Sequence, residues 1–502
     1  MEPQNSVTHS YLLAIDQGTS SSRAIVFNVK GENCGSHQIP IQQYYPHDGW
    51  VEHDPAEIWK TTLLCCKNAI KNAKISAKNI AAIGITNQRE TTIIWDKKTG
   101  ELIYPAIVWQ DRRTADLCKK LSDNKNNVEY VSNKTGLLID PYFSATKINW
   151  ILDHVVGARK RAENGELAFG TIDTFLLWKL TGGKSFLTDA TNASRTLLFN
   201  IHTQNWDDEL LSLFNIPKKL LPDVKDCSAH FGTTEKSLFN VEIPITGIAG
   251  DQQAATIGQA CFQEGMIKST YGTGCFIVLN TGKTVVKSRH GLLSTIAYRL
   301  NNKVTYALEG SIFSAGVAVK WLHENLKLIS SPETCEKYCN EIENTNGVYF
   351  VPAFTGLGAP YWNPNARAAI FGITRDTHIC HIVRAALESV CYQTTDLIHA
   401  ISDDYKKPLQ MLKVDGGMSK NNWLLQFLSN MLNLPVERPK CIETTALGAA
   451  FLAGLGIGLY KNLQDVAQFN SQEKIFSPQF SNQDREKFYA GWKEAVQRVI
   501  IR

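Results

Sequence analysis

Short apolar runs separated by glycine-containing polar turns dominate the hydrophobic pattern of this chain. The first pair of runs, residues 11–15 and 24–27, flanks a polar turn and predicts a β-hairpin. A second pair of the same form lies in MIKSTYGTGCFIVLNTG, residues 266–282, and has Gly272 and Thr273 at its tip. Because one hairpin lies near the start of each half, we interpret the pattern as an internal repeat, with two domains of similar topology and a junction near residues 252–262. Coincidence is the alternative, since Gly-Thr turns are common.

Helical periodicity alternates with these strands. Residues 56–72 place Ile58, Leu63 and Leu64 on one face and predict a helix. Further strands are predicted at residues 83–86 and 91–95 and at the start of segments 244–261 and 411–422, and further helices near Ser144 and over residues 311–326, 381–398, 423–432 and 484–500. Strands that alternate with helices indicate an α/β fold.

Length and composition narrow the class of protein. The 502 residues exceed one ordinary domain, and 43% hydrophobic with 20% charged residues is a globular composition. The net charge of +4, spread along the chain, does not favour nucleic acid or a membrane surface as a partner. No run approaches the roughly 20 apolar residues that span a bilayer, and the polar start MEPQNSVTHS lacks the apolar core of a secretory signal. We expect a soluble, cytoplasmic protein whose twelve cysteines stay reduced.

The turn of the first hairpin combines one carboxylate with a glycine and four hydroxyls, namely Asp16, Gly18, Thr19, Ser20, Ser21 and Ser22. Backbone N–H groups in a glycine turn bind anions, and a carboxylate beside them fits a phosphate only when magnesium or its waters lie between. The turn therefore suggests a magnesium–phosphate cradle, and a solvated hairpin turn is the alternative. The second hairpin and the segment VDGGMSKNN add two further glycine turns, the latter with Gly416, Gly417 and Asn421, which would cap the helix that follows. Three such turns in this order point to a nucleotide.

Phosphoryl transfer also needs a carboxylate that takes the proton of the acceptor. Asp251 in GIAGDQQAA stands between a predicted strand and a predicted helix and suits that role, although a helix N-cap is the alternative. Arg89 and Glu90 in NQRETT form either a solvated loop or a donor–acceptor pair for a polyhydroxy substrate. Trp109, Tyr142 and Phe276 would by default be core aromatics.

From about Leu12 to Leu455 the chain resembles the FGGY family of carbohydrate kinases, which shares the ribonuclease-H-like fold of the actin-like ATPases. AIDQGTSSSR resembles the first phosphate motif of that family, STYGTGCF the second, and VDGGMSKNN its adenosine motif. YFSATKINW and AAIFGITRDTHICHIVRAALE are similar to two stretches typical of the whole family. NQRE, VWQDRR and GDQQAA resemble the forms found in its glycerol-phosphorylating members.

This resemblance implies two ribonuclease-H-like domains that flank a central cleft and close on substrate. Residues 1–255 would carry the first phosphate motif and the glycerol site, and residues 256–502 the second phosphate and adenosine motifs. The implied reaction is ATP-dependent phosphorylation of glycerol to sn-glycerol 3-phosphate, which feeds glycerol catabolism and glycerolipid synthesis. A homodimer is expected, because family members form dimers or tetramers.

The resemblance also implies a role for each matching residue. Asp251 would be the general base, and Asp16 would hold magnesium through water. Glycerol would contact Arg89, Glu90, Trp109, Tyr142, Asp251, Gln252 and Phe276, and ATP would contact Thr19, Ser20, Ser21, Arg23, Thr273, Gly316, Gly417 and Asn421.

Two other functions stay open at the level of sequence. The nearer one is a kinase of another polyol or sugar, against which Arg89, Glu90 and Trp109 argue because they suit a small triol. The other is a non-catalytic actin-like ATPase, which needs neither Asp251 nor paired hydroxyl-binding residues.

One departure from the resemblance predicts a regulatory difference. Some bacterial members carry a glycine-rich, basic loop before GIAGDQQ that is linked to inhibition by a sugar bisphosphate, whereas this chain has the short GTTEKSLFNVEIP with a single lysine. We therefore expect fructose 1,6-bisphosphate to leave the kinase activity unchanged. Assaying the rate over a titration of that compound checks this, and a clear fall in rate would contradict it.

Overall fold

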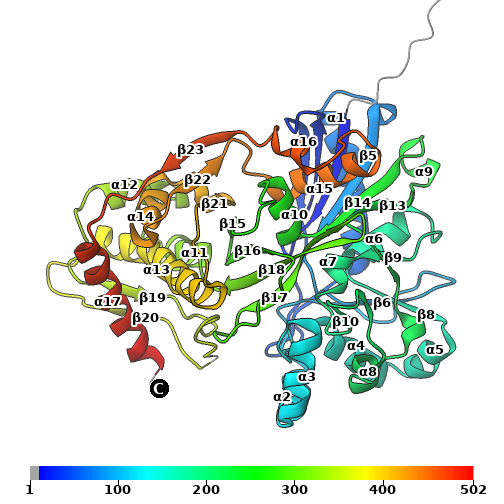
Figure 1. Ribbon diagram of the computed structural model, residues 1–502, viewed down its shortest axis with the longest axis horizontal. Coiled ribbons are helices and arrows are strands. Elements are labelled where there is room, and N and C mark those ends of the chain that lie inside the picture. The colour runs from blue at the N-terminus through cyan, green and yellow to red at the C-terminus, as the bar shows by residue number, and fades with distance from the viewer. Residues whose placement is uncertain (1–10, 364, 501–502) are drawn as a thin grey trace, which may run out of the picture. The chain divides into compact units, whose positions relative to one another are not determined.

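The computed structural model describes residues 11–363 and 365–500, and its elements are labelled in Figure 1. The chain forms two compact units. Unit 1 extends to Ala260 and also includes Ser294–Tyr306 and Thr444–Phe469, and unit 2 comprises Cys261–Leu293, Ala307–Glu443 and the chain from Asn470 onward. The units are thus interleaved in sequence, and the contiguous division between residues 255 and 256 stays a prediction. Within the described residues, every helix is too short or too polar to span a bilayer.

Unit 1 is built on a six-stranded mixed sheet in the order β13-β14-β5-β1-β2-β3. β1 pairs antiparallel with β2 and parallel with β5, and β14 continues on the other side of β5 in parallel. Their apolar residues are fully buried, as Leu12–Ile15 show, and this accounts for the unbroken apolar run of the first strand. The strands are β1 (Tyr11–Gln17), β2 (Ser21–Asn28), β3 (Asn33–Pro40), β5 (Ile80–Asn87), β13 (Ser228–Thr233) and β14 (Pro244–Gly250).

Helices and four two-stranded ribbons complete unit 1. The predicted helix over residues 56–72 is confirmed as α1 (Pro55–Asn72), which Asp54 caps and Pro55 begins. The predicted strand at residues 91–95 starts later, as β6 (Ile93–Asp96), because Thr92 forms only an isolated bridge to Ile107. The ribbons are β4 (Glu52–His53) with β7 (Ala106–Ile107), β6 with β8 (Leu167–Gly170), β9 (Leu187–Asp189) with β12 (Asp223–Lys225), and β10 (Phe199–Asn200) with β11 (Asn205–Trp206). The other helices are α2 (Ala115–Ser122), α3 (Lys125–Thr135), α4 (Ser144–His154), α5 (Ala158–Asn164), α6 (Ile172–Leu180), α7 (Ala190–Ala193), α8 (Asp208–Leu213), α9 (Lys236–Phe239), α10 (Asp251–Gly258), α15 (Thr444–Gly456) and α16 (Leu463–Ala467).

Helix α15 lies near the C-terminal end of the sequence but packs on the sheet and on α10 of unit 1. Glycines make this close approach possible. A Cβ atom at Gly448 would lie 1.8 Å from the carbonyl oxygen of Ala254, and one at Gly84 of β5 would lie 2.0 Å from that of Ala449. The small residues of α15 therefore hold α10, and with it Asp251, against the sheet.

Unit 2 repeats the same strand plan. The second sheet of the protein has the order β17-β18-β16-β15-β21-β22-β23, of which β15, β16, β21, β22 and β23 lie wholly in unit 2. β15 is antiparallel to β16 and parallel to β21. β15 thus corresponds to β1, β16 to β2, and β21 to β5, so the predicted internal repeat and the α/β class are confirmed. The strands are β15 (Ile267–Tyr271), β16 (Cys275–Gly282), β17 (Leu293–Leu300), β18 (Lys303–Ile312), β21 (Leu412–Asp415), β22 (Val436–Pro439) and β23 (Gln472–Phe476), with a separate ribbon of β19 (Tyr349–Val351) and β20 (Ala369–Phe371).

The helices of unit 2 follow the prediction with shifted bounds. The helix expected over residues 311–326 begins only at Gly316, because Ser311 and Ile312 still belong to β18. The helix expected over residues 381–398 is longer at both ends. The helices are α11 (Gly316–Glu324), α12 (Cys335–Asn340), α13 (Ile379–Tyr405), α14 (Asn422–Leu432) and α17 (Asn482–Ile500).

We expect Gly448→Ala to destabilise the protein by about 1–3 kcal/mol or more, because the new methyl group meets the backbone of α10 and not a side chain that can move. Urea unfolding followed by circular dichroism measures this difference. Gly157→Asn is the control, since nothing lies within 4 Å of a Cβ there and asparagine tolerates its left-handed backbone. Equal stability of the Gly448 variant and the wild type would contradict the proposed packing.

Candidate active site

The turn between β1 and β2 lies at the carboxyl end of β1 and carries the first set of predicted phosphate-binding residues. Gly18 donates its backbone N–H to the carbonyl of Ser21 (2.9 Å), which closes the turn tightly. Asp16 and Arg23 are direct cross-strand partners and form an ion pair of 2.6 Å. The Ser20 side chain is exposed, and Ser21 accepts a hydrogen bond from Gln38 (2.7 Å). The turn thus presents backbone donors, hydroxyls and one neutralised carboxylate together.

Arg89, just beyond the end of β5, connects two of the predicted substrate residues. Its Nε lies 3.1 Å from Oδ1 of Asp251, and its Nη2 donates to the hydroxyl of Tyr142 (3.3 Å). The Arg89 side chain is 2% exposed, whereas that of Asp251 is 32% exposed. Asp251 is the first residue of α10 and Gly250 precedes it as the N-cap, so the N-cap interpretation of Asp251 is wrong. Asp251 is therefore a partly exposed carboxylate whose orientation is fixed by the buried guanidinium of Arg89.

Glu90 adopts the left-handed backbone conformation (φ 54°), which is rare for a residue with a side chain and concentrates at functional sites. Its carboxylate accepts a hydrogen bond from Nε of Arg195 (2.7 Å), and both side chains are buried. The Arg195 guanidinium also lies over the rings of Tyr142 (5.6 Å) and Phe143 (5.4 Å). Arg195 therefore fixes Glu90 and Tyr142 at once, a role that the sequence interpretation missed.

Trp109 and Tyr142 form an aromatic wall beside these polar groups. Their ring centroids are 5.5 Å apart in an edge-to-face arrangement. The indole Nε1 of Trp109 donates to Oγ1 of Thr19 (2.9 Å) in the phosphate turn. These contacts replace the default interpretation of both residues as core aromatics, because neither side chain is fully buried.

Two further buried side chains hold these loops, and neither was predicted. The ammonium group of Lys147 donates to the carbonyls of Pro141, Tyr142 and Phe143 (2.5, 2.8 and 3.1 Å), and burial lowers its pKa to about 8. The imidazole of His53 lies within hydrogen-bonding distance of Gln88 (3.3 Å) and Gln43 (3.4 Å). Gln88 in turn donates to the carbonyl of Gly18 (3.2 Å), so His53 supports the phosphate turn through Gln88.

Burial lowers the pKa of His53 to about 4, and a hydrogen bond to the backbone of Thr19 offsets part of that effect. The imidazole is therefore neutral at physiological pH. A neutral ring beside the phosphate turn contributes hydrogen bonds and no charge.

Unit 2 brings its own glycine turns together. The backbone of Thr273 accepts hydrogen bonds from Ala315 (3.0 Å) and Val317 (3.1 Å), and Gly316 donates to the carbonyl of Gly272 (3.0 Å), so the tip of the second hairpin holds the start of α11. A Cβ at Gly316 would lie 2.5 Å from the carbonyl of Gly272 and 3.5 Å from Sδ of Met418, next to Gly417. Asn421 caps α14 by accepting from Leu424 (2.9 Å), as predicted.

The two remaining predicted substrate residues lie in different units. Gln252 follows Asp251 in α10 of unit 1, is 4% exposed, and donates its backbone N–H to Oδ1 of Asp251 (2.7 Å). Phe276 lies on β16 of unit 2, opposite Thr270. Unit 1 therefore gathers Arg89, Glu90, Trp109, Tyr142, Asp251 and Gln252 around one group of contacts.

Comparison with known proteins places these features in a family. The N-terminal domain of the FGGY family of carbohydrate kinases matches residues 11–258, and the C-terminal domain of that family matches residues 267–457. A glycerol kinase of Pseudomonas aeruginosa is 60% identical over 489 residues, which cover 97% of this chain and 99% of the relative.

Solved structures of carbohydrate kinases have the same fold as this chain. A Plasmodium falciparum glycerol kinase with ADP superposes with a TM-score of 0.91 at 40% identity, covering 98% of both chains. A xylulose kinase of Lactobacillus acidophilus, 22% identical, has a TM-score of 0.86 over 98% of this chain and 99% of its own, which shows the fold alone. The predicted fold class, two ribonuclease-H-like domains of the actin-like ATPase type, is confirmed.

The depressed pKa of His53 predicts a pH dependence of stability. Between the ordinary pKa of 6.5 and the folded value of about 4, His53 is protonated in the unfolded chain but neutral in the folded protein. The free energy of unfolding therefore falls as the pH falls through this window. The loss reaches roughly 3 kcal/mol at its lower end. We expect His53→Gln to flatten the stability profile between pH 6.5 and 4.5, measured by urea unfolding. His230→Gln, at an exposed histidine, is the control and should follow the wild type. Parallel profiles for His53→Gln and the wild type would refute this account.

Proposed function

Because the chain belongs to the FGGY family of carbohydrate kinases, we propose that it transfers the γ-phosphoryl group of ATP to glycerol and forms sn-glycerol 3-phosphate and ADP. The observation that carries the proposal is the bridge from Asp251 through Arg89 to Tyr142, with Glu90 beside it. The 60% identity to a glycerol kinase over 97% of this chain supports the choice of substrate within the family. A cytoplasmic location and a homodimer stay predictions from the sequence.

Recognition of a triol needs donors and acceptors in pairs. Arg89 offers N–H donors, Glu90 and Asp251 offer acceptors, and the hydroxyl of Tyr142 can do either. Trp109 supplies an apolar face for the carbon backbone, and Phe276 and Gln252 complete the proposed set. A site built in this way to bond each hydroxyl disfavours analogues that lack one by up to about 10⁴–10⁵-fold.

Asp251 is the proposed general base. Its Oδ1 is engaged by Arg89 and by the backbone of Gln252, which fixes the orientation of the carboxylate. The partial exposure of the side chain allows contact with a substrate hydroxyl, whose proton the carboxylate accepts as the oxygen attacks phosphorus. The ion pair with Arg89 also places a buried positive charge beside this carboxylate.

The proposed nucleotide site uses both glycine hairpins. Thr19, Ser20, Ser21, Arg23 and Thr273 would bind phosphates, and Gly316, Gly417 and Asn421 would border the adenosine. The bond from Trp109 to Thr19 ties the wall of the glycerol site to the phosphate turn. Positioning of the two substrates relative to each other is the main source of catalysis in phosphoryl transfer.

Magnesium fits the chemistry of the first turn. Among the described residues, no group of three or more His, Cys, Asp and Glu side chains could hold a metal directly. Asp16 gives Oδ2 to Arg23, and no described residue donates a hydrogen bond to its Oδ1, so that oxygen suits a metal-bound water. Bound magnesium would neutralise phosphate charge there, with Asp16 as its contact through water.

The test of this function is an assay of ATP consumption with magnesium, with and without glycerol, that follows ADP and glycerol 3-phosphate together. Equal yields of both products, dependent on glycerol, are expected. ADP formed without glycerol 3-phosphate would mean that the acceptor is wrong. A panel with xylulose, gluconate and erythritol separates the proposal from the rival polyol or sugar kinase, and faster turnover on any of these would favour the rival.

Asp251→Asn should lower kcat by orders of magnitude while the KM for ATP changes little, because the shape is kept and the base is lost. Steady-state kinetics at saturating glycerol measure both constants. Asp208→Asn, at a side chain 76% exposed at the start of α8, is the matched control and should keep full activity. Near-normal kcat in Asp251→Asn would exclude this residue as the base.

A further inference from the structure

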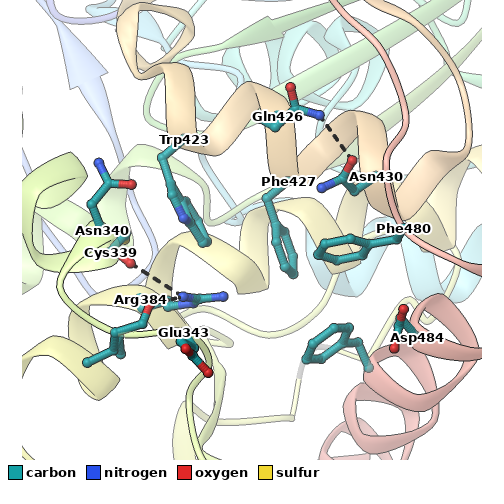
Figure 2. A pocket seen from close by; sticks show the side chains of 12 residues that line it. Cys339, Asn340, Glu343, Arg384, Trp423, Gln426, Phe427, Asn430, Phe480 and Asp484 are labelled. Atoms are coloured by element: carbon teal, nitrogen blue, oxygen red, sulfur yellow. Dashed lines mark hydrogen bonds between the residues drawn. The ribbon is translucent and has the colours of Figure 1, made fainter.

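Unit 2 contains a cavity of about 430 Å³ whose lining includes none of the proposed active-site residues. The cavity is bordered by α12 and the loop after it, α13, α14, and the chain around the start of α17 (Figure 2). Its volume falls within the range of about 300–1,000 Å³ that is usual for small-molecule sites.

One wall of the cavity is aromatic. Trp423 and Phe427 are stacked with centroids 5.1 Å apart and ring planes inclined by 12°. Phe480 lies 5.8 Å from Phe427, and Phe488 is stacked on Phe480 at 5.6 Å. Figure 2 shows the rings of Phe427 and Phe480 next to each other. The guanidinium of Arg384 lies over the Trp423 ring (4.9 Å), so a flat aromatic ligand would pack on the phenylalanine rings, face to face or edge to face.

Arg384 supplies a buried donor on the floor. Its side chain is 6% exposed, its Nε donates to Glu388 (2.9 Å), and its Nη1 donates to the carbonyls of Cys339 (3.3 Å) and Ile342 (2.5 Å). No described residue accepts a hydrogen bond from Nη2. Because Glu388 neutralises the guanidinium, the floor offers a donor without net charge and does not require an anion.

Asn430 supplies a second donor. Its Oδ1 accepts hydrogen bonds from the backbone N–H of Gln479 (2.8 Å) and from Nε2 of Gln426 (3.0 Å), and a backbone N–H can only donate, so the orientation of the amide is fixed. Nδ2 has no hydrogen-bond partner among the described residues, although Asn430 is only 4% exposed. Figure 2 shows this nitrogen turned toward Phe427. Two accessible N–H donors on largely buried side chains thus belong to residues that line the cavity.

The opening of the cavity has the opposite character. Glu343 and Asp484 line it with exposed carboxylates, which accept hydrogen bonds and repel anions. A ligand that fits both ends is flat, carries a carbonyl acceptor at its inner edge and N–H or O–H donors at its outer edge, and has no negative charge.

We propose that this cavity is a second small-molecule site, which binds neutral heteroaromatic lactams such as pyrimidine bases and their nucleosides. Carbonyl groups of the ring accept hydrogen bonds from Arg384 and from Asn430, and the ring packs on the aromatic wall. The sugar hydroxyls of a nucleoside donate to Glu343 and Asp484. A nucleotide is disfavoured because its phosphate would lie near two carboxylates. The proposal stands whether or not the chain phosphorylates glycerol.

The test is a titration with uridine, followed by ligand-observed saturation-transfer NMR with the full chain and saturating ADP, which occupies any nucleotide site. Saturable binding of uridine is expected, with at least fivefold weaker binding of uridine 5′-monophosphate. Absence of saturable uridine binding, displacement of uridine by ADP, or tighter binding of the monophosphate would overturn the proposal.

Asn430→Asp keeps the oxygen that accepts from Gln479 but removes the donor, so uridine should bind at least tenfold more weakly. Asn433→Asp is the matched control, because it makes the same change at an exposed residue that ends the same helix. Asp484→Asn is an independent variant at an exposed position, and it should reduce the preference for uridine over its monophosphate. Unchanged uridine affinity in folded Asn430→Asp, or an unchanged preference in Asp484→Asn, would contradict the assignment.

Discussion

Three parallel strands of unit 1 end at the same level, and the candidate site depends on that alignment. Gln17 at the end of β1 and Gly250 at the end of β14 are both register partners of Asn87 at the end of β5. The residues that follow these strands therefore emerge together at the carboxyl edge of the sheet, where α/β proteins place their ligands. The phosphate turn comes after β1, and Asp251 comes after β14. The residues directly after β5 are Gln88, Arg89 and Glu90.

Each of the three consecutive residues after β5 contacts a different part of the candidate site. Gln88 contacts the phosphate turn and His53, Arg89 contacts Asp251 and Tyr142, and Glu90 contacts Arg195. Buried charges are costly unless they are paired, so each of these ionic side chains needs its partner in place for the fold to be stable. The same pairing that makes their burial tolerable also gives the loop a single arrangement.

Unit 2 repeats this arrangement of parallel strands followed by turns. β15 and β21 are parallel neighbours, with Thr270 opposite Asp415, and glycine turns follow both strands. Here the turns carry backbone and small side chains in place of the charged set of unit 1. Glycine at residue 416, with φ 86° and a hypothetical Cβ 2.4 Å from the carbonyl of Tyr271, shows how closely the turns approach. Helix α14, which Asn421 caps, also carries four of the residues that line the aromatic cavity, so one helix would contribute to both proposed sites.

Local chemistry was enough to predict much of this protein from its sequence. The two hairpins, helix α1 and the cap at Asn421 follow from apolar periodicity and turn residues that are neighbours in sequence. The internal repeat followed from the similar form of the two hairpins. Resemblance to a family then assigned roles to residues such as Arg89 and Asp251, whose contact with each other fits those roles. The bounds of α11 were missed because an apolar run fits the end of a strand as well as the start of a helix.

Only the tertiary structure revealed Arg195, His53 and Lys147 as supports of the site, and the return of α15 to unit 1. Arg195 meets Glu90 across 105 positions of sequence, and Trp109 meets Thr19 across 90. Which of several buried polar residues will find each other over such distances depends on the register of the sheet and the packing of its helices. A single sequence carries the residue types for these contacts, but their pairing is decided only when the folded chain brings them together.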